Sequence, residues 1–131
     1  MPEIRTKSTD DSWAEGDGIR IFVTRYWPRG HGREECDEWM PNLAPSQRLL
    51  RDFQDGEISW ARFRIRYRIQ MLKGYGSEEG ENPRMRDSGQ KYVLRFLKFI
   101  AETRRVTLLC TCPPDQDRCH RILLKDLIEK S

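Results

Sequence analysis

The chain has 131 residues, the length of one domain, and 34% of them are charged. Its 24 basic and 21 acidic residues leave a net charge of only +3, which excludes a polyelectrolyte tail and a domain that binds nucleic acid by charge alone. No apolar run approaches the roughly 20 residues that cross a bilayer, and the first residues lack a secretory signal, so we expect a cytoplasmic protein with no membrane partner.

The first half of the chain predicts strands and short helices. The segment IRIFVTR indicates an interior strand, because apolar side chains fall on both of its faces, and Pro28 and Gly30 then end it in a turn. Ser46 or Pro45 is placed to begin a later helix. The expected ranges, in chain order, are strands at 4–7 and 19–25 and helices at 33–40 and 47–53.

Residues 60–71 fit two periods at once. Every second residue from 62 to 68 is an arginine, and apolar residues alternate with them, which is the period of a strand. Trp60, Phe63 and Tyr67 are spaced by three and four, which is the period of a helix. The periodicity alone favours the strand.

The second half of the chain begins with a glycine-bearing segment and ends in a helix. We expect a flexible loop at about 73–90, because four glycines and a proline fall there. Asp87 or Ser88 would cap the next helix, and Asp117 the last one. The remaining ranges, in chain order, are a helix ending at 103, a strand at 106–112 and a helix at 118–130.

This order of strands and helices predicts a small α/β fold. We expect a mainly parallel β-sheet flanked by α-helices in a Rossmann-like three-layer arrangement, as a single domain over residues 1–131. Right-handed crossovers would place the strands 19–25 and 106–112 side by side. Ligands collect beyond the carboxyl ends of such strands. The candidate sites therefore lie at these two ends.

The end of the strand 19–25 predicts an anion site. Arginine accounts for 18 of the 24 basic residues, and its guanidinium group pairs bidentately with phosphates and carboxylates. A small anionic ligand would be bound by Arg25, Trp27, Arg29 and Gly30, together with Arg121 from the other strand end. The alternative is an ordinary tight turn, in which the indole belongs to the core and the arginines pair with nearby acids.

The end of the strand 106–112 is rich in cysteine and leaves several interpretations open. Cys110, Cys112, Cys119 and His120 are zinc ligands by type. Their spacing argues against a metal, because the Cα atoms of Cys110 and Cys112 lie about 6.6 Å apart in an extended strand, whereas two sulfur ligands of one zinc come within about 4 Å. We therefore assign no metal and no cofactor. A phosphatase-like loop from Cys112 to Arg118 is also disfavoured, because its two prolines lack the N–H groups that bind phosphate.

A reactive thiol is the next interpretation of these cysteines. Cys119 is expected near a helix N-terminus among basic neighbours, which lowers the pKa of a thiol, and the adjacent His120 completes a tentative catalytic pair. Cys112 would be its redox partner. The remaining alternative treats Cys110 and Cys112 as core residues, with Cys119 and His120 closing the start of the helix.

Nucleic acid is a further class of partner. The arginines of 60–71 and of the neighbouring segments would have to line one stripe interleaved with aromatic residues. On a helix, alternate positions spread around the axis instead, and the acids are nearly as numerous as the bases. Paired and solvated faces are therefore favoured over a nucleic-acid surface.

The assembled motifs resemble the domain-of-unknown-function 488 family, in its short YeaO-like branch. That branch reads V-D-R-x-W-P-R-G, then D-x-W and L-A-P-S, then W-x2-F-x2-R-Y, then V-T-L-L. The matching segments here are Val23–Gly30, Asp37–Trp39, Leu43–Ser46, Trp60–Tyr67 and Val106–Leu109, and a C-H-R of other branches matches Cys119–Arg121.

The resemblance implies a compact α/β fold and a helix, rather than a strand, over 60–71. It implies no reaction, because the family has no established activity. Thr24 stands where the family has an aspartate, and the longer 73–90 segment and the cysteine-rich end also depart from the branch. We therefore expect an uncharacterised protein that binds a small anionic ligand. The alternatives are a cysteine-dependent enzyme or redox protein, and a nucleic-acid-associated protein.

Overall fold

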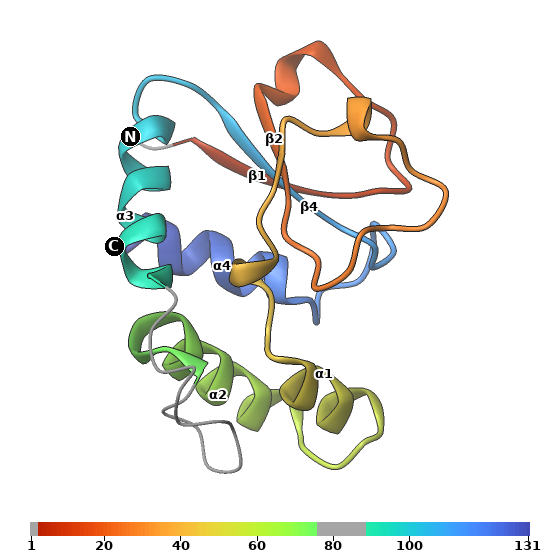
Figure 1. The fold of residues 1–131 in the computed structure, drawn as a ribbon, viewed down its shortest axis with the longest axis vertical. Helices are drawn as coiled ribbons and strands as arrows, with labels where there is room; N and C mark the ends of the chain where they lie inside the picture. Colours follow the sequence, from red (N-terminus) through yellow and green to blue (C-terminus); the bar gives the residue numbers. More distant parts are fainter. Residues whose placement is uncertain (1–2, 76–88) are drawn as a thin grey trace.

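The computed structural model describes residues 3–75 and 89–131. Three strands separated by 3-10 helices come first, and α-helices then precede and follow the last strand (Figure 1). The strands are β1 (Ile4–Ser8), β2 (Ile19–Phe22), β3 (Glu38–Trp39) and β4 (Val106–Cys110). The helices are α1 (Gln47–Gln54), α2 (Trp60–Lys73), α3 (Gln90–Ala101) and α4 (His120–Glu129), and short 3-10 helices lie at Glu15–Asp17, Arg33–Glu35 and Pro41–Leu43.

The four strands form one parallel sheet in the order β1-β4-β2-β3. Val106 of β4 pairs with Ile4 on one side and with Ile19 on the other. This arrangement confirms the predicted α/β class and the predicted neighbourhood of the strands at 19 and 106. The carboxyl ends of β1, β2 and β4 therefore meet at one edge of the sheet.

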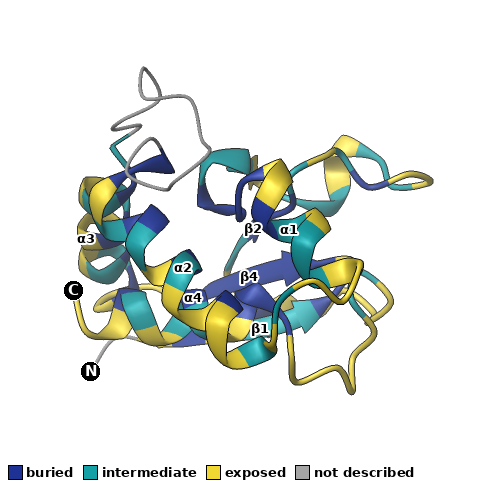
Figure 2. Cartoon of the chain, turned by 90° about the horizontal axis from the view of Figure 1, so that it is seen from below, coloured by how far each residue is buried: buried dark blue, intermediate teal, exposed yellow. Residues whose placement is uncertain are grey.

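The main hydrophobic core lies between the sheet and the helices. Alternate residues of the strands, such as Ile21, Val106 and Leu108, pack with buried residues of α2, α3 and α4 in a single cluster. Burying these side chains completely contributes roughly 1.5–3 kcal/mol each. Figure 2 shows β4 in dark blue among the helices, because all five of its residues are buried.

The other face of the sheet is covered by loops and 3-10 turns instead of long helices. Phe22 packs there against Trp27, with ring centroids 5.3 Å apart. Thr107 donates a hydrogen bond of 2.6 Å to the carbonyl of Asp17. Within the described residues, the α-helices therefore pack on one face of the sheet.

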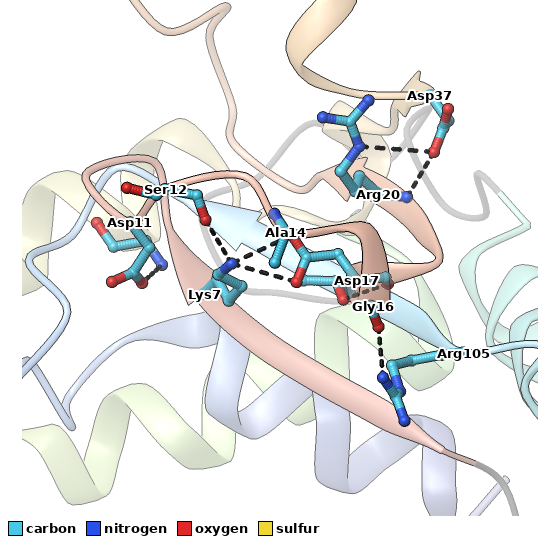
Figure 3. Close-up of polar contacts among 11 residues, drawn as sticks. Lys7, Asp11, Ser12, Ala14, Gly16, Asp17, Arg20, Asp37 and Arg105 are labelled. Carbon is cyan, nitrogen blue, oxygen red and sulfur yellow. Dashed lines mark hydrogen bonds and ion pairs between the residues drawn. The ribbon is translucent and has the colours of Figure 1, made fainter.

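An ion pair anchors the loop that follows β1 (Figure 3). Lys7 Nζ lies 3.1 Å from the carboxylate of Asp17, which is only 3% exposed, and it also donates to the Ser12 carbonyl at 2.7 Å. The Asp17 carboxylate accepts a further hydrogen bond of 3.0 Å from the Ala14 N–H. Because buried carboxylates are costly unless they are paired, these contacts fix the loop on the sheet.

Gly18 lets this loop enter β2 against the backbone of Arg105. Its φ of 68° and ψ of −133° are disfavoured for residues with a side chain. A Cβ atom at this position would overlap the Arg105 carbonyl oxygen, which already accepts the Ile19 N–H at 2.9 Å. The close approach therefore requires glycine.

The helix predicted at 33–40 is wrong. The structure has a 3-10 turn there, followed by the short edge strand β3. Asp37 N–H donates to the Arg20 carbonyl and Met40 N–H to the Phe22 carbonyl, each at 2.8 Å, and the Asp37 carboxylate accepts the Arg20 N–H. Pairing with β2 therefore overrides the local helical tendency.

Other predicted elements are confirmed with shifted ends. Residues 60–71 fall in the helix α2, as the family resemblance implies and against the strict alternation. Ser46 caps α1, since its Oγ accepts the Leu49 N–H at 3.1 Å. The last helix begins at His120 rather than 118, and its N-cap is Cys119 instead of Asp117.

Two further predictions concern where the strands end and the loop predicted at 73–90. The strands predicted at 19–25 and 106–112 end earlier, at Phe22 and Cys110. The predicted loop at 73–90 and the predicted caps Asp87 and Ser88 fall almost entirely outside the described residues. No helix within the described ranges is long and apolar enough to cross a membrane.

Candidate functional site

Arg25, at the carboxyl end of β2, binds backbone carbonyls of the L-A-P-S segment. Its Nε and Nη2 donate to the Pro45 carbonyl at 3.1 and 2.9 Å, and Nη2 also reaches the Ala44 carbonyl at 3.2 Å. The same Nη2 lies 2.7 Å from the Tyr75 hydroxyl, and the guanidinium group lies over the Tyr75 ring. These donors are used within the protein, and none of the acids predicted as alternative partners is among them.

Two side chains of α2 also hold this segment. The hydroxyl of the fully buried Tyr67 donates to the Leu43 carbonyl at 2.6 Å, and burial raises its pKa well above the ordinary value. Gln70 accepts the Ser46 N–H and donates to the Ser46 Oγ, both at 2.9 Å. The family motifs at 25, 43–46 and 67 thus meet in one buried hydrogen-bonded network.

The remaining predicted anion-binding residues point to separate surroundings. Trp27 donates its indole N–H to the His31 carbonyl at 2.9 Å and packs edge-on against Trp39. Arg29 is exposed, and no hydrogen bond or ion pair to it is found within residues 3–75 and 89–131. Gly30 has a φ of 79° in an open turn. The structure therefore does not gather these residues around one described pocket with Arg25.

The cysteine-rich end of β4 does form a cluster. The sulfur atoms of Cys110 and Cys119 and Nδ1 of His120 all lie within 4.8 Å of one another, and all three residues are buried. Cys112 Sγ lies 3.9 Å from Cys110 Sγ. The predicted separation of Cys110 and Cys112 along an extended strand is wrong, because β4 ends at Cys110 and the chain bends before Cys112. The spacing argument against a metal therefore fails.

His120 is oriented by a single backbone acceptor. Its Nε2 lies 2.7 Å from the Val23 carbonyl, at the end of β2, and its ring packs edge-on against Tyr67 at 5.8 Å between centroids. A carbonyl oxygen only accepts, so Nε2 carries a hydrogen, and Nδ1 is the ring nitrogen that can offer a lone pair. That lone pair faces Cys110 and Cys119, at 4.0 and 3.9 Å.

The thiols of the cluster shift one another's acidity. Hydrogen bonding with the thiols of Cys112 and Cys119 lowers the pKa of Cys110. The hydrogen bonds with Cys110 raise the pKa values of Cys112 and Cys119. The acidities of the three thiols are therefore linked through their hydrogen bonds.

Arg121 is a buried cation beside the cluster, with only 2% of its surface exposed. Its guanidinium group donates to the carbonyls of Cys112 at 3.2 Å and Pro113 at 3.1 Å, while its Nε has no partner among the described residues. No carboxylate of residues 3–75 and 89–131 forms an ion pair with it. Buried charges are costly unless they are compensated, so the cluster is a natural place for negative charge.

Sequence reasoning placed Cys119, His120 and Cys112 at one site but gave Cys110 no chemical role beyond a zinc ligand or a core residue. The structure places Cys110 at the centre, in contact with each of the others. The signal for its position was the C-x-C pattern at the end of a buried strand.

The arginines weighed as a nucleic-acid stripe lie on different sides of α2. Arg62, Arg64 and Arg68 are exposed, while Arg66 pairs with Asp52 of α1 at 3.4 Å. Binding to nucleic acid, the disfavoured alternative of the sequence, stays untested.

Comparisons with known proteins agree with these motifs. A family model described as the active DUF488-N3 subclade (DUF488-N3a) matches residues 4–131. The chain is 32% identical over 102 residues to the uncharacterized protein YeaO of Escherichia coli (strain K12). The aligned region covers 76% of this chain and 85% of that protein. No solved structure matches the chain significantly.

Proposed function

The chain belongs to the DUF488 family, and from this premise we propose that it is a cysteine-dependent redox protein that reacts through Cys112 and Cys110. The observation that carries the proposal is the contact of 3.9 Å between their sulfur atoms, beside a third thiol and an imidazole. The description of the matching family model as an active subclade supports a chemical role for the chain.

Within the cluster, Cys112 is the thiol that an outside reagent reaches first. It is half-buried, whereas Cys110 and Cys119 are 4% and 3% exposed. Cys110 lies directly behind it and is placed to complete a disulfide. Nδ1 of His120 is an acceptor for a thiol proton in the same cluster.

The proposed reaction is exchange with a low-molecular-weight disulfide. Cys112 loses its thiol proton and attacks one sulfur of that disulfide, which forms a mixed disulfide and releases the first small thiolate, and this thiolate takes up a proton. The Cys110 thiolate then attacks the Cys112 sulfur and releases the second one. The protein loses two electrons and two protons and gains the Cys110–Cys112 bond, while the small disulfide is reduced to two thiols.

Oxidised glutathione is expected to convert the reduced protein to a form with one internal disulfide. Peptide mapping by mass spectrometry would place the bond between Cys110 and Cys112, and Cys112→Ser would abolish it. Cys36→Ser is the matched control and should leave it unchanged, because Cys36 lies outside the cluster. A bond between Cys112 and Cys119 would instead support the pair predicted from the sequence. Reaction confined to Cys36, or no reaction, would overturn the proposal.

An anionic ligand at the end of β2 stays a second candidate function, supported by the exposed Arg29, whose donors have no partner among the described residues. At a concentration 100-fold above its dissociation constant, a bound phosphate or nucleotide would stabilise the fold by about 2.7 kcal/mol. A thermal-shift series should then show a rise in Tm of several degrees that disappears in Arg29→Ala and persists in Arg51→Ala. A flat series with phosphate and nucleotides would contradict this candidate.

A further inference from the structure

We propose that Cys110, Cys112, Cys119 and His120 bind one zinc ion as a tetrahedral site. This inference goes beyond the thiol exchange described above and does not depend on it, although it uses the same side chains. Zinc is the class of cation that fits the donors, because it is a borderline-soft ion that accepts thiolate and imidazole in tetrahedral sites.

The distances between the donor atoms are close to those of such a site. Zinc–sulfur bonds of about 2.3 Å and zinc–nitrogen bonds of about 2.0 Å place two sulfurs about 3.8 Å apart and a sulfur and a nitrogen about 3.5 Å apart. Here the Cys110–Cys112 sulfur contact is 3.9 Å, and His120 Nδ1 lies 4.0 and 3.9 Å from the sulfurs of Cys110 and Cys119. Movements of a few tenths of an ångström bring these three pairs to the edges of a tetrahedron. Cys110, Cys119 and His120 lie within 4.8 Å of one another, and Cys112, in contact with Cys110, would complete the set as the fourth ligand.

His120 already has the tautomer and orientation that a metal requires. A ligating histidine almost always donates its other ring N–H to a carbonyl, a carboxylate or water, which directs the free nitrogen at the ion. His120 donates Nε2–H to the Val23 carbonyl at 2.7 Å and turns Nδ1 toward the thiols. The ring is 7% exposed and is held by Tyr67, so this orientation needs no rearrangement on binding.

Charge at the cluster also favours the site. Three thiolates, one neutral imidazole and Zn²⁺ carry a net charge of −1. The buried Arg121 lies beside Cys112 with a positive charge that no described carboxylate pairs. The zinc complex and this guanidinium group together would be neutral, which removes the cost of an isolated buried cation.

Cobalt(II) and zinc(II) titrations of the reduced full chain test the inference. Tetrahedral thiolate coordination gives Co²⁺ an intense visible absorption and a near-ultraviolet charge-transfer band, and we expect both to saturate at one equivalent and to be displaced by Zn²⁺. Zinc affinity follows from competition with a chromogenic chelator. Cys36→Ser is the control and should match the wild type.

Ligand variants give the expected fold-changes. Loss of an outer-shell partner weakens metal binding by about 10–100-fold, so Cys119→Ser, which removes a ligand, should weaken it by at least about 100-fold. Because Cys119 is buried, circular dichroism is used to check that the Cys119→Ser variant still folds. The more exposed Cys112→Ser provides the second test, with a charge-transfer band reduced by about one third as three thiolates become two.

The outcomes separate this inference from the proposed redox function. Uptake of one metal ion without any disulfide after treatment with oxidised glutathione supports the zinc site and overturns the thiol exchange. Disulfide formation in a chain that takes up neither cobalt nor zinc supports the thiol exchange and overturns the zinc site. If both occur, oxidation should release zinc, because the Cys110–Cys112 bond consumes two ligands. Metal uptake that is unchanged in both cysteine variants overturns the site.

Discussion

Replacing Gly18 with alanine should destabilise the fold by about 3 kcal/mol or more. The backbone there has a φ of 68° and a ψ of −133°, and holding a residue with a side chain in such a conformation costs on the order of 1–3 kcal/mol. The new methyl group would also overlap the Arg105 carbonyl oxygen, so the junction between β2 and β4 would have to open. Urea unfolding followed by circular dichroism measures the loss directly.

Gly56→Ala is the matched control for this change. Gly56 also has a positive φ, of 77°, but a Cβ atom there would meet nothing within 4 Å. The conformational strain alone should cost about 1 kcal/mol. The two variants therefore separate strain from overlap, and equal losses would show that the close approach of Gly18 to Arg105 is not needed for stability.

The location of the Gly18 junction explains why the loss should be large. The turn from Asp17 to Ile19 carries the carboxylate that pairs with Lys7 (Figure 3). It also carries the carbonyl that accepts from Thr107. Displacing it would weaken the loop cover over a whole face of the sheet. A glycine between a polar loop and an apolar strand is visible in the sequence, but its contact with Arg105 is not, because 86 residues lie between the two positions.

The parallel sheet was predictable from the sequence because its strands are apolar on both faces. The edge strand β3 was not, because residues 38–39 are stabilised by pairing with β2 rather than by any pattern of their own. In residues 60–71, by contrast, a clear sequence pattern disagrees with the observed structure. Their alternation of arginines fits a strand, yet Phe63, Tyr67 and Met71 are buried on one face of α2, and tertiary packing of that face decides the outcome.

The candidate site was predictable in its location but not in its composition. Parallel strands bring the ends of β2 and β4 together, so the sequence indicated the correct edge of the sheet. The role of Arg25 was not visible, because its partners are backbone carbonyls of Ala44 and Pro45, which no side-chain pattern reveals. The contact between Cys110 and Cys112 was missed for a similar reason, since it depends on where the strand ends.

Replacing the fully buried Gln70 with leucine should destabilise the fold by about 2–4 kcal/mol. Leucine is similar in size, but it removes the acceptor of the Ser46 N–H and the donor to the Ser46 Oγ. Leaving each such buried group without this partner costs roughly 1–3 kcal/mol, partly offset by the added apolar burial. Gln47→Leu on the exposed side of α1 should change the free energy of unfolding by less than about 0.5 kcal/mol.

Gln70→Glu tests whether hydrogen bonding, rather than shape, is responsible. A protonated carboxyl group can accept the Ser46 N–H and donate to the Ser46 Oγ as the amide does, whereas a buried carboxylate cannot donate and loses its hydration. Burial should therefore raise the pKa of this glutamate in the folded state above its unfolded value. The penalty relative to wild type should be fully present above the folded pKa and should shrink as the pH falls toward the unfolded pKa. A difference from wild type that stays constant between pH 8 and pH 4 would contradict the hydrogen-bonding account, and the L-A-P-S segment would then depend on packing alone.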